Sequence, residues 1–327
     1  MTIIERDPWR VQYFEKVACP ADVDIPTDDA YAFDWNPRHR WIYDKLLVAR
    51  TQGLDCGRGD SPPLHYPVFC KPVTNLKGMG LDIHVLHDVN DFNRFCKPGH
   101  FWMTLLQGEH VSSDIAVCEG KPIWHRHAVG LPGLEGTFDY WTVRSNHSET
   151  LTRYCHDWVR AHLTGYTGMM NMETIGGRII EAHLRFADQW PDLYGEGWVD
   201  AVVGLYARGH WQFDDTRRKE GFSVALFGPH DRRYLHPSPT TLARYRREPG
   251  ISSVQITFDQ GQPNESHAMP PGGFRLAIVN CWSLDAGLRL RRRIAADFGL
   301  LQRPRFGKNC AKIRNKYSAP RNRRAAN

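Results

Sequence analysis

The chain has 327 residues, of which 41% are hydrophobic, 12% aromatic and 24% charged. This length permits a sizeable core divided over two or three subdomains, and the aromatic content excludes a wholly disordered chain. The net charge of +6 comes from residues 301–327, which hold nine lysines and arginines and no acidic residue. The basic character therefore belongs to a tail, and the rest of the chain is slightly acidic.

We expect the chain to be cytoplasmic. No stretch approaches the ~18 apolar residues that span a bilayer, and the first residues lack the apolar segment of a secretory signal, so we expect no membrane association. The eight cysteines are scattered without CxxC pairs. This pattern favours reduced, mostly buried thiols over a zinc ribbon or a disulfide framework. We expect residues 301–327 to be disordered, with binding of RNA or another polyanion as the alternative.

The first half of the chain alternates between short predicted elements. Residues 1–35 are rich in proline and aspartate with little periodicity, which indicates an extended arm. Residues 38–53 show apolar side chains near helical spacing and end at a glycine, which predicts a helix. A glycine loop is predicted over 75–80. The other predicted elements are strands over 65–73, 81–86, 101–108, 110–118 and 121–129 and a short helix over 89–96.

The second half begins with the clearest amphipathic pattern. Residues 148–164 predict a helix with Ser148 as its N-cap. A hairpin of two strands, 169–174 and 178–184, is predicted across the turn at Gly176 and Gly177. After Arg185 the pattern indicates a small α+β subdomain. Its predicted elements are helices over 197–209, 240–248 and 284–299 and strands over 222–228, 251–258 and 274–283.

A lysine and a glycine loop form the first candidate site. Lys71 ends the strand predicted over 65–73, and Gly78 and Gly80 follow closely. A fixed positive charge and glycine amides that approach phosphate oxygens without a Cβ in the way suit a polyphosphate. The loop is neither the Walker pattern nor GxGxxG before a helix, so it indicates neither a P-loop nor a Rossmann domain. A surface hairpin is the alternative explanation.

The predicted hairpin gathers polar side chains on one face. Because side chains alternate along a strand, Asn171 and Glu173 share a face, and so do Glu181, His183 and Arg185. The other face is expected to hold the apolar side chains of Met172, Ile180, Ala182 and Leu184. Two carboxylates brought so close repel each other unless a cation lies between them, and a divalent cation bridging ATP phosphates fits that need. An exposed hairpin with a polar face and no function is the alternative.

The order of these elements resembles the ATP-grasp superfamily. The resemblance runs through DKLLVA, YPVFCKPV, the glycine loop, LLQGEHVSSDI, the turn EGKP and a carboxylate hairpin ending EAHLR. It implies an α+β fold in which two α+β lobes grip ATP, with a reduced or absent N-terminal domain. We therefore predict an N-terminal arm (1–35), an ATP-grasp-like region (36–205), a small C-terminal α+β subdomain (206–300) and the basic tail (301–327).

The resemblance implies a role for each matching residue. Lys71 and Arg185 would be catalytic, with the arginine stabilising charge on the transferring phosphoryl group. Glu173, Glu181 and His183 would bind Mg²⁺ or Mn²⁺, with Asn171 as an alternative ligand. His183 stands where the family usually has asparagine, and an imidazole suits Mn²⁺ better than Mg²⁺. The nucleotide-binding residues would be Lys45, Lys71, Lys77, Gly78, Gly80, Met103, Thr104, Leu105, Leu106 and His110.

The implied activity is that of an ATP-dependent ligase. Such an enzyme activates a small-molecule carboxylate as an acylphosphate, which an amine or another nucleophile then attacks, with release of ADP and phosphate. The alternatives are an inactive ATP-binding protein of the same fold, and a nucleic-acid-associated protein acting through its tail.

His125 and His127 share a strand face and could hold zinc with a third histidine, although structural histidines are commoner. Residues 130–141 match an acceptor-binding loop. The sequence leaves open whether the chain forms a homo-oligomer.

Overall fold

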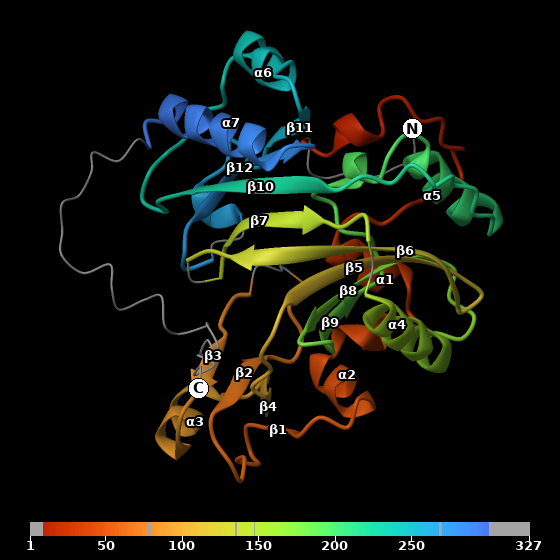
Figure 1. Ribbon diagram of the computed structural model, residues 1–327. Coiled ribbons are helices and arrows are strands. Elements are labelled where there is room, and N and C mark those ends of the chain that lie inside the picture. Colours follow the sequence, from red (N-terminus) through yellow and green to blue (C-terminus); the bar gives the residue numbers. More distant parts are fainter. Residues whose placement is uncertain (1–8, 77–79, 135, 147, 268–269, 301–327) are drawn as a thin grey trace, which may run out of the picture.

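Two antiparallel sheets form the frame of the protein in the computed structural model, which describes residues 9–76, 80–134, 136–146, 148–267 and 270–300 (Figure 1). The smaller sheet has the strand order β1-β4-β2-β3. Its strands are β1 (Cys56–Arg58), β2 (Val68–Pro72), β3 (His84–Leu86) and β4 (His100–Thr104). The larger sheet has the order β11-β12-β10-β7-β6-β5-β8-β9. Its strands are β5 (His110–Cys118), β6 (Lys121–Pro132), β7 (Phe138–Val143), β8 (Gly168–Ile175), β9 (Arg178–His183), β10 (Gly221–Gly228), β11 (Ile251–Ile256) and β12 (Phe274–Cys281).

Helices cover both faces of the larger sheet. The α-helices of the described residues are α1 (Asp29–Trp35), α2 (Lys45–Thr51), α3 (Val89–Phe95), α4 (Glu149–His162), α5 (Trp198–Arg208), α6 (Pro239–Arg246) and α7 (Leu284–Asp297), with short 3-10 turns at Val11–Tyr13, Arg40–Tyr43, Pro191–Leu193 and Asn264–Ser266. Of these, α3 packs against the smaller sheet, where Phe92 shares a core with Val68 and Leu86. On β5 the side chain of Ile115 packs in one core with Trp158 of α4, while Ala116 packs in another with Trp198 of α5. The two faces of one strand therefore serve two cores.

One predicted helix cap is confirmed, and one predicted helix is divided. Ser148 caps α4 and accepts a hydrogen bond from the Leu151 amide at 3.3 Å. The helix predicted over 38–53 is split, because the Asp44 side chain caps α2 and accepts from the Leu47 amide at 2.9 Å. The preceding residues, Arg40–Tyr43, form a separate 3-10 turn.

Three elements arise where no regular structure was predicted. The expected N-terminal arm contains α1, which begins with the Asp28 side chain accepting from the Tyr31 amide at 2.8 Å. This helix spans seven residues, too few to show a repeated apolar pattern. Strand β1 lies in the glycine- and proline-rich segment, and the loop expected over 130–141 holds the end of β6 and the start of β7.

The C-terminal strands continue the larger sheet. β10 pairs with β7 through Val224 opposite Tyr140, and β12 lies between β10 and β11. The strands and helices predicted after residue 205 are present, but their sheet is the one that β5–β9 begin. The boundary at 205/206 stays a prediction. Lys77, Gly78 and the basic tail lie outside the described residues. Within the described part of the chain, every helix is too short or too polar to cross a membrane.

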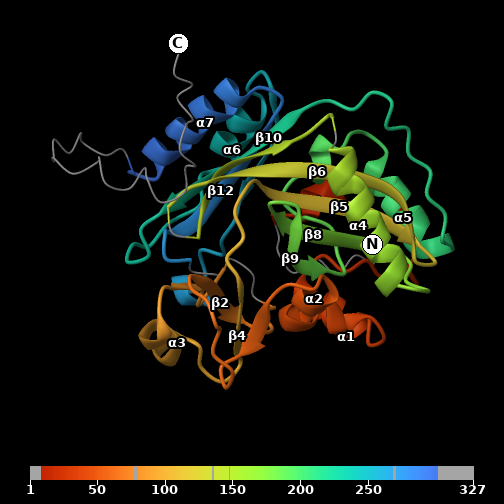
Figure 2. The same ribbon diagram turned by 60° about the horizontal axis from the view of Figure 1, so that its bottom comes forward.

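The last strand of the larger sheet, β9, lies beside α2. Gln52, which follows α2, donates from Nε2 to the Ile179 carbonyl at 2.8 Å and accepts from the Ile179 amide at 2.8 Å. Tyr154 of α4 donates to the same Gln52 Oε1 at 2.6 Å. Figure 2 shows α1 and α2 next to this end of the larger sheet. At Ile179, the Gln52 side chain therefore makes the two backbone hydrogen bonds that a neighbouring strand would otherwise make.

The hairpin turn allows a test of local packing. Gly176 and Gly177 have φ values of +56° and +77°, and a Cβ on Gly176 would lie 2.1 Å from the Gln107 carbonyl oxygen, whereas Gly177 faces open space. We expect Gly177→Ala to lower the free energy of unfolding by about 1 kcal/mol for the left-handed backbone alone. Gly176→Ala should cost clearly more, because the backbone contact must also shift. Denaturant unfolding of both variants measures the difference, and equal losses would contradict this account of the turn.

Candidate active site

The candidate site lies where the two sheets meet. Residues 105–109 connect β4 of the smaller sheet to β5 of the larger one. Lys71 on β2 donates from Nζ to the Ile180 carbonyl on β9 at 2.7 Å. Lys45, the first residue of α2, forms an ion pair with Glu181 of β9, with 2.5 Å between Nζ and Oε2. Two lysines that are distant in sequence therefore converge on one edge strand.

The register of the β8–β9 hairpin brings the two glutamates together. Glu173 lies opposite Glu181, and Asn171 lies opposite His183. The two-residue turn with positive φ at both glycines suits a tight hairpin. A register shift follows Glu173, so that Thr174 pairs with Ile179. The shift corrects the predicted apolar face, because Ile179 rather than Ile180 packs in the core.

Glu181 is held in its ionised form. Burial alone would raise the pKa of Glu181, but the charges of Lys45, His183 and Lys71 outweigh burial and hold that pKa well below its usual range. The Lys45 side chain is only 10% exposed. The backbone amide of Lys45 is fixed as well, since it donates to the Val73 carbonyl at 2.9 Å. Lys45 is therefore a positioned cation.

Among the lysines of the site, Lys71 has the pKa that its surroundings shift most. Its Nζ lies 5.9 Å from the ring centroids of both Phe69 and Phe101, and the residue is 4% exposed. Burial, and then the nearby charge of Lys45, lower the pKa of Lys71 to about 7, although Glu181 and Glu173 act in the opposite direction. Lys71 therefore gains or loses its charge near neutral pH, and an added anion would favour the charged form.

His110 pairs with the second glutamate. Its Nε2 lies 2.8 Å from Glu173 Oε2, and the imidazole makes edge contacts with the rings of Phe138 and Trp141 at 5.1 and 5.4 Å between centroids. His110, one of the residues predicted to bind the nucleotide, thus lies directly beside Glu173, a predicted metal ligand. The aromatic rings fix its orientation from β7.

Asp29 is a member of this cluster that the sequence did not reveal. It belongs to α1, is 6% exposed, and accepts from Arg185 Nη2 at 2.9 Å through Oδ2. Its Oδ1 lies 2.9 Å from His183 Nδ1. Burial would raise the pKa of Asp29, but Arg185 and His183 hold it well below its usual range. An aspartate in an aperiodic segment carries no local signal of a partner 154 residues away.

Three predicted metal ligands meet at one point. Oxygen atoms of Glu173 and Glu181 and a ring nitrogen of His183 all lie within 4.8 Å of one another. Two carboxylates and one imidazole are ligands that Mn²⁺ or Mg²⁺ accepts, so this donor set fits a divalent cation. Asn171, the alternative ligand, instead donates to Ser112 at 2.8 Å and to Asp114 at 2.7 Å. Its Nδ2 is therefore engaged with β5, and only its Oδ1 could bind a metal.

The predicted nucleotide-binding segment is placed along the connection between the sheets. Met103 is buried within β4, which is hydrogen-bonded on both sides, and the Thr104 amide donates to Asp55. These two residues therefore offer no free amide. The amides of Leu105 and Leu106 donate to no backbone group of the described residues. Gly80 has a φ of +56° at the end of the glycine loop.

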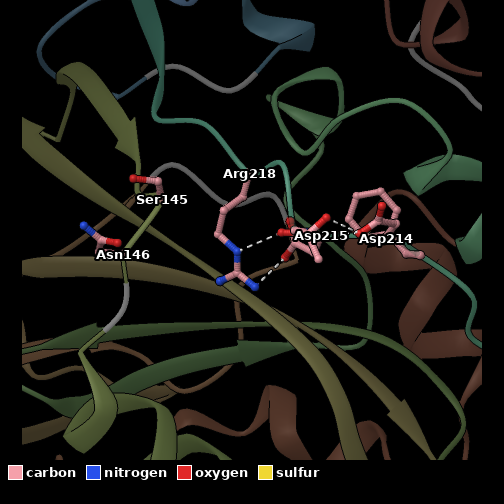
Figure 3. A pocket seen from close by; sticks show the side chains of 7 residues that line it. Ser145, Asn146, Asp214, Asp215 and Arg218 are labelled. Atoms are coloured by element: carbon pink, nitrogen blue, oxygen red, sulfur yellow. Dashed lines mark hydrogen bonds and ion pairs between the residues drawn. The ribbon is translucent and has the colours of Figure 1, made fainter.

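Two surface hollows lie apart from this cluster. The larger, of about 560 Å³, is lined by Ser145, Asn146, Phe213, Asp214, Asp215, Thr216 and Arg218 (Figure 3). Of its charged residues, Asp215 pairs with Arg218 at 3.0 Å and also with the buried Arg126. The second borders His125 and His156. In the described part of the chain, the one group of three potential metal donors is Glu173, Glu181 and His183, so zinc binding at His125 and His127 gains no support.

Comparison with known proteins finds likeness in structure but not in sequence. No protein-family model matches the chain, and no curated protein matches its sequence. An L-amino acid ligase from Bacillus licheniformis is 11% identical, with 88% of this chain and 82% of that chain covered at a TM-score of 0.57. Carboxyaminoimidazole ribonucleotide synthase from Aspergillus clavatus, complexed with ATP, is 10% identical, with 83% and 80% covered at a TM-score of 0.56.

A third solved structure carries a nucleotide with its metal. The biotin carboxylase domain of 2-oxoglutarate carboxylase from Hydrogenobacter thermophilus, in complex with MgADP, ADP and bicarbonate, is 14% identical, with 74% of this chain and 62% of that chain covered at a TM-score of 0.50. Sequence identities this low establish the fold only, and the chemistry has to be inferred from the residues of the site. Because the neighbours are ATP-grasp proteins and match most of this α+β chain, the chain has the ATP-grasp fold that its sequence predicts.

Proposed function

We propose that this protein is an ATP-dependent ligase that activates a carboxylate as an acylphosphate for attack by an amine or another nucleophile, releasing ADP and phosphate. One observation carries the proposal: Lys45 and Lys71 converge on the edge strand that presents Glu181, within the cluster completed by Glu173 and His183. Phosphoryl transfer from ATP needs fixed cations beside metal-binding carboxylates, and this cluster supplies both. The ATP complex of a protein with the same fold supports the choice of nucleotide.

The residues of the chain would divide the work between binding and charge neutralisation. Lys45 and Lys71 would bind phosphate oxygens, and the backbone amides of Leu105 and Leu106 would meet the base. His110 would contact the ribose while remaining near Glu173. Positioning of this kind can provide a large part of the rate enhancement of a phosphoryl transfer.

Glu173, Glu181 and His183 would hold Mg²⁺ or Mn²⁺, which would neutralise charge on the phosphates when bound. Arg185 follows the edge strand and its Nη1 donates to the Phe186 carbonyl at 3.2 Å, while Nη2 pairs with Asp29. A guanidinium held at both Nη atoms has a fixed orientation, which suits stabilisation of charge on the transferring phosphoryl group. Lys71 would serve the same group from the opposite sheet.

A second candidate function is ATP binding without turnover. It is favoured by the imidazole at position 183 and by the ion pairs already present, because Lys45 is bound to Glu181 and Glu173 lies next to His110. A phosphate would have to compete with Glu181 for Lys45. Nucleotide binding without carboxylate-dependent ADP release would favour this candidate over the ligase.

Removal of the charge of Lys71 tests the proposed function. We expect Lys71→Met to keep the packing against Phe69 and Phe101 but to weaken ATP binding at least tenfold, about 1.4 kcal/mol, because a buried cation facing phosphate is lost. Titration calorimetry with Mg²⁺ and with Mn²⁺ measures this effect. Lys121→Met is the matched control, since Lys121 is exposed and lies at the opposite end of the β5–β6 hairpin from His110.

The control should bind ATP like the native protein. Native protein that binds ATP should then release ADP when the correct carboxylate and nucleophile are added, and a screen of carboxylic acids measures that release. Absence of ATP binding with either metal in folded native protein would refute both the ligase and the ATP-binding candidate. Equal weakening in the two variants would show that Lys71 has no special place in the site.

The lowered pKa of Lys71 predicts a proton linkage. In the free protein Lys71 is charged below about pH 7 and neutral above it. Bound phosphate favours the charged form, so ATP binding at about pH 8 should take up a proton at Lys71, and affinity should fall as pH rises through this range. Calorimetry in two buffers of different ionisation enthalpy counts the proton. The phosphate of ATP titrates in both proteins, so the difference between native and Lys71→Met isolates the lysine; no difference would contradict the assignment.

A further inference from the structure

The N-terminal segment contributes a buried carboxylate to the candidate metal site. Asp29 has three partners: the Arg185 guanidinium at Oδ2, and His183 Nδ1 and the Tyr43 hydroxyl at Oδ1, at 2.9 and 3.3 Å. The Tyr43 hydroxyl in turn accepts from the Leu184 amide at 3.1 Å. A buried carboxylate is tolerated only when it is paired and hydrogen-bonded, as here. Its position and its charge are therefore both fixed.

The hydrogen bond to Asp29 determines which nitrogen of the neutral His183 ring carries the proton. An ionised carboxylate can only accept hydrogen bonds, so the contact of 2.9 Å between Asp29 Oδ1 and His183 Nδ1 requires a proton on Nδ1. In the neutral ring the lone pair then lies on Nε2. That nitrogen lies 3.9 Å from Glu181 Oε1, too far for a hydrogen bond. His183 Nε2 and Glu181 Oε1 are therefore close enough to bind one cation together.

We propose that Asp29 is a positioning residue that fixes His183 with its Nε2 lone pair toward Glu173 and Glu181, so that the site selects Mn²⁺ over Mg²⁺. This inference rests on the proposed function for the presence of a metal. Mg²⁺ prefers an all-oxygen octahedron, whereas Mn²⁺ accepts an imidazole nitrogen more readily. A carboxylate behind a histidine ligand fixes its tautomer and raises its basicity.

The variant Asp29→Asn removes the negative charge of the side chain and keeps its size and shape. An asparagine has one acceptor atom where aspartate has two, and the Arg185 guanidinium, which can only donate, should take that oxygen. The amide nitrogen of the variant would then face His183 Nδ1 and donate to it. The ring would have to carry its proton on Nε2, where it blocks a metal bond. The substitution is therefore expected to switch the tautomer while leaving the volume nearly unchanged.

The first measurement reads the tautomer without metal or nucleotide. Nitrogen-15 NMR of the imidazoles in the native full chain is expected to show Nδ1 protonated and Nε2 unprotonated at His183. In Asp29→Asn the two assignments should exchange. A native His183 with its proton on Nε2 would overturn the proposal, and so would an unchanged tautomer in the folded variant. His183→Asn supplies the assignment, because its spectrum lacks that one ring.

The second measurement compares Mn²⁺ and Mg²⁺ binding in a double-mutant cycle. Native protein should bind Mn²⁺ at least about tenfold more tightly than Mg²⁺, and Asp29→Asn should weaken Mn²⁺ binding about 10- to 100-fold. In His183→Asn the preference should shrink, and adding Asp29→Asn should then change Mn²⁺ binding less than about twofold. Equal affinity for the two metals in native protein, or an equal effect of Asp29→Asn in both backgrounds, would refute the positioning role.

These readings remain separate from the ligase test. Neither requires ATP, a carboxylate or turnover, so a protein that fails to release ADP can still confirm the Asp29–His183 arrangement. Conversely, ATP-dependent ADP release with no preference for Mn²⁺ would support the proposed function and refute the positioning role of Asp29. If Asp29→Asn does not fold, the native tautomer and the metal preference of His183→Asn still decide the question.

Discussion

The ion pair between Lys45 and Glu181 joins the first turn of α2 to the edge of the larger sheet, and its two side chains are only 10% and 21% exposed. Removing charges from water costs several kcal/mol for each ion, so such pairs persist only with good geometry and further hydrogen bonds. Around this pair, Lys71 reaches the Ile180 carbonyl and Arg185 reaches Asp29. The three cations come from different parts of the chain, namely α2, β2 and the residue after Leu184, so the positions of these segments depend on one another.

The hairpin is predictable from sequence because its determinants are local. Alternation with a period of two and a turn of two glycines predicts a hairpin with a polar face, but an unbroken register from that turn would place Glu173 opposite Ile180. The register shift after Glu173 is what places it opposite Glu181. The register shift that sends Ile179 rather than Ile180 into the core is not predictable in the same way. A bulge depends on packing and hydrogen bonds supplied by neighbours, which a single strand does not encode.

Elements that lack a local pattern escape prediction, and one of them carries a residue of the site. α1 spans seven residues, and Asp29 is one of several aspartates in a segment whose composition indicates an arm. Its partners His183 and Arg185 follow more than 150 residues later. The C-terminal strands are predictable one by one, but their pairing with β7 depends on a contact between distant segments. In this chain the individual helices and strands are therefore more predictable than the way in which they pack and pair with one another.

The position of β9 at the end of the larger sheet has a consequence for solubility. An edge strand offers unpaired backbone groups to other chains and invites aggregation unless it is covered. Here Gln52 occupies both backbone groups of Ile179, and Lys71 occupies the carbonyl of Ile180. Lys71 thus belongs to the candidate site and also shields part of this edge from pairing with another strand, while Gln52 shields the rest. Protection of the sheet edge and assembly of the site therefore share the Lys71 contact.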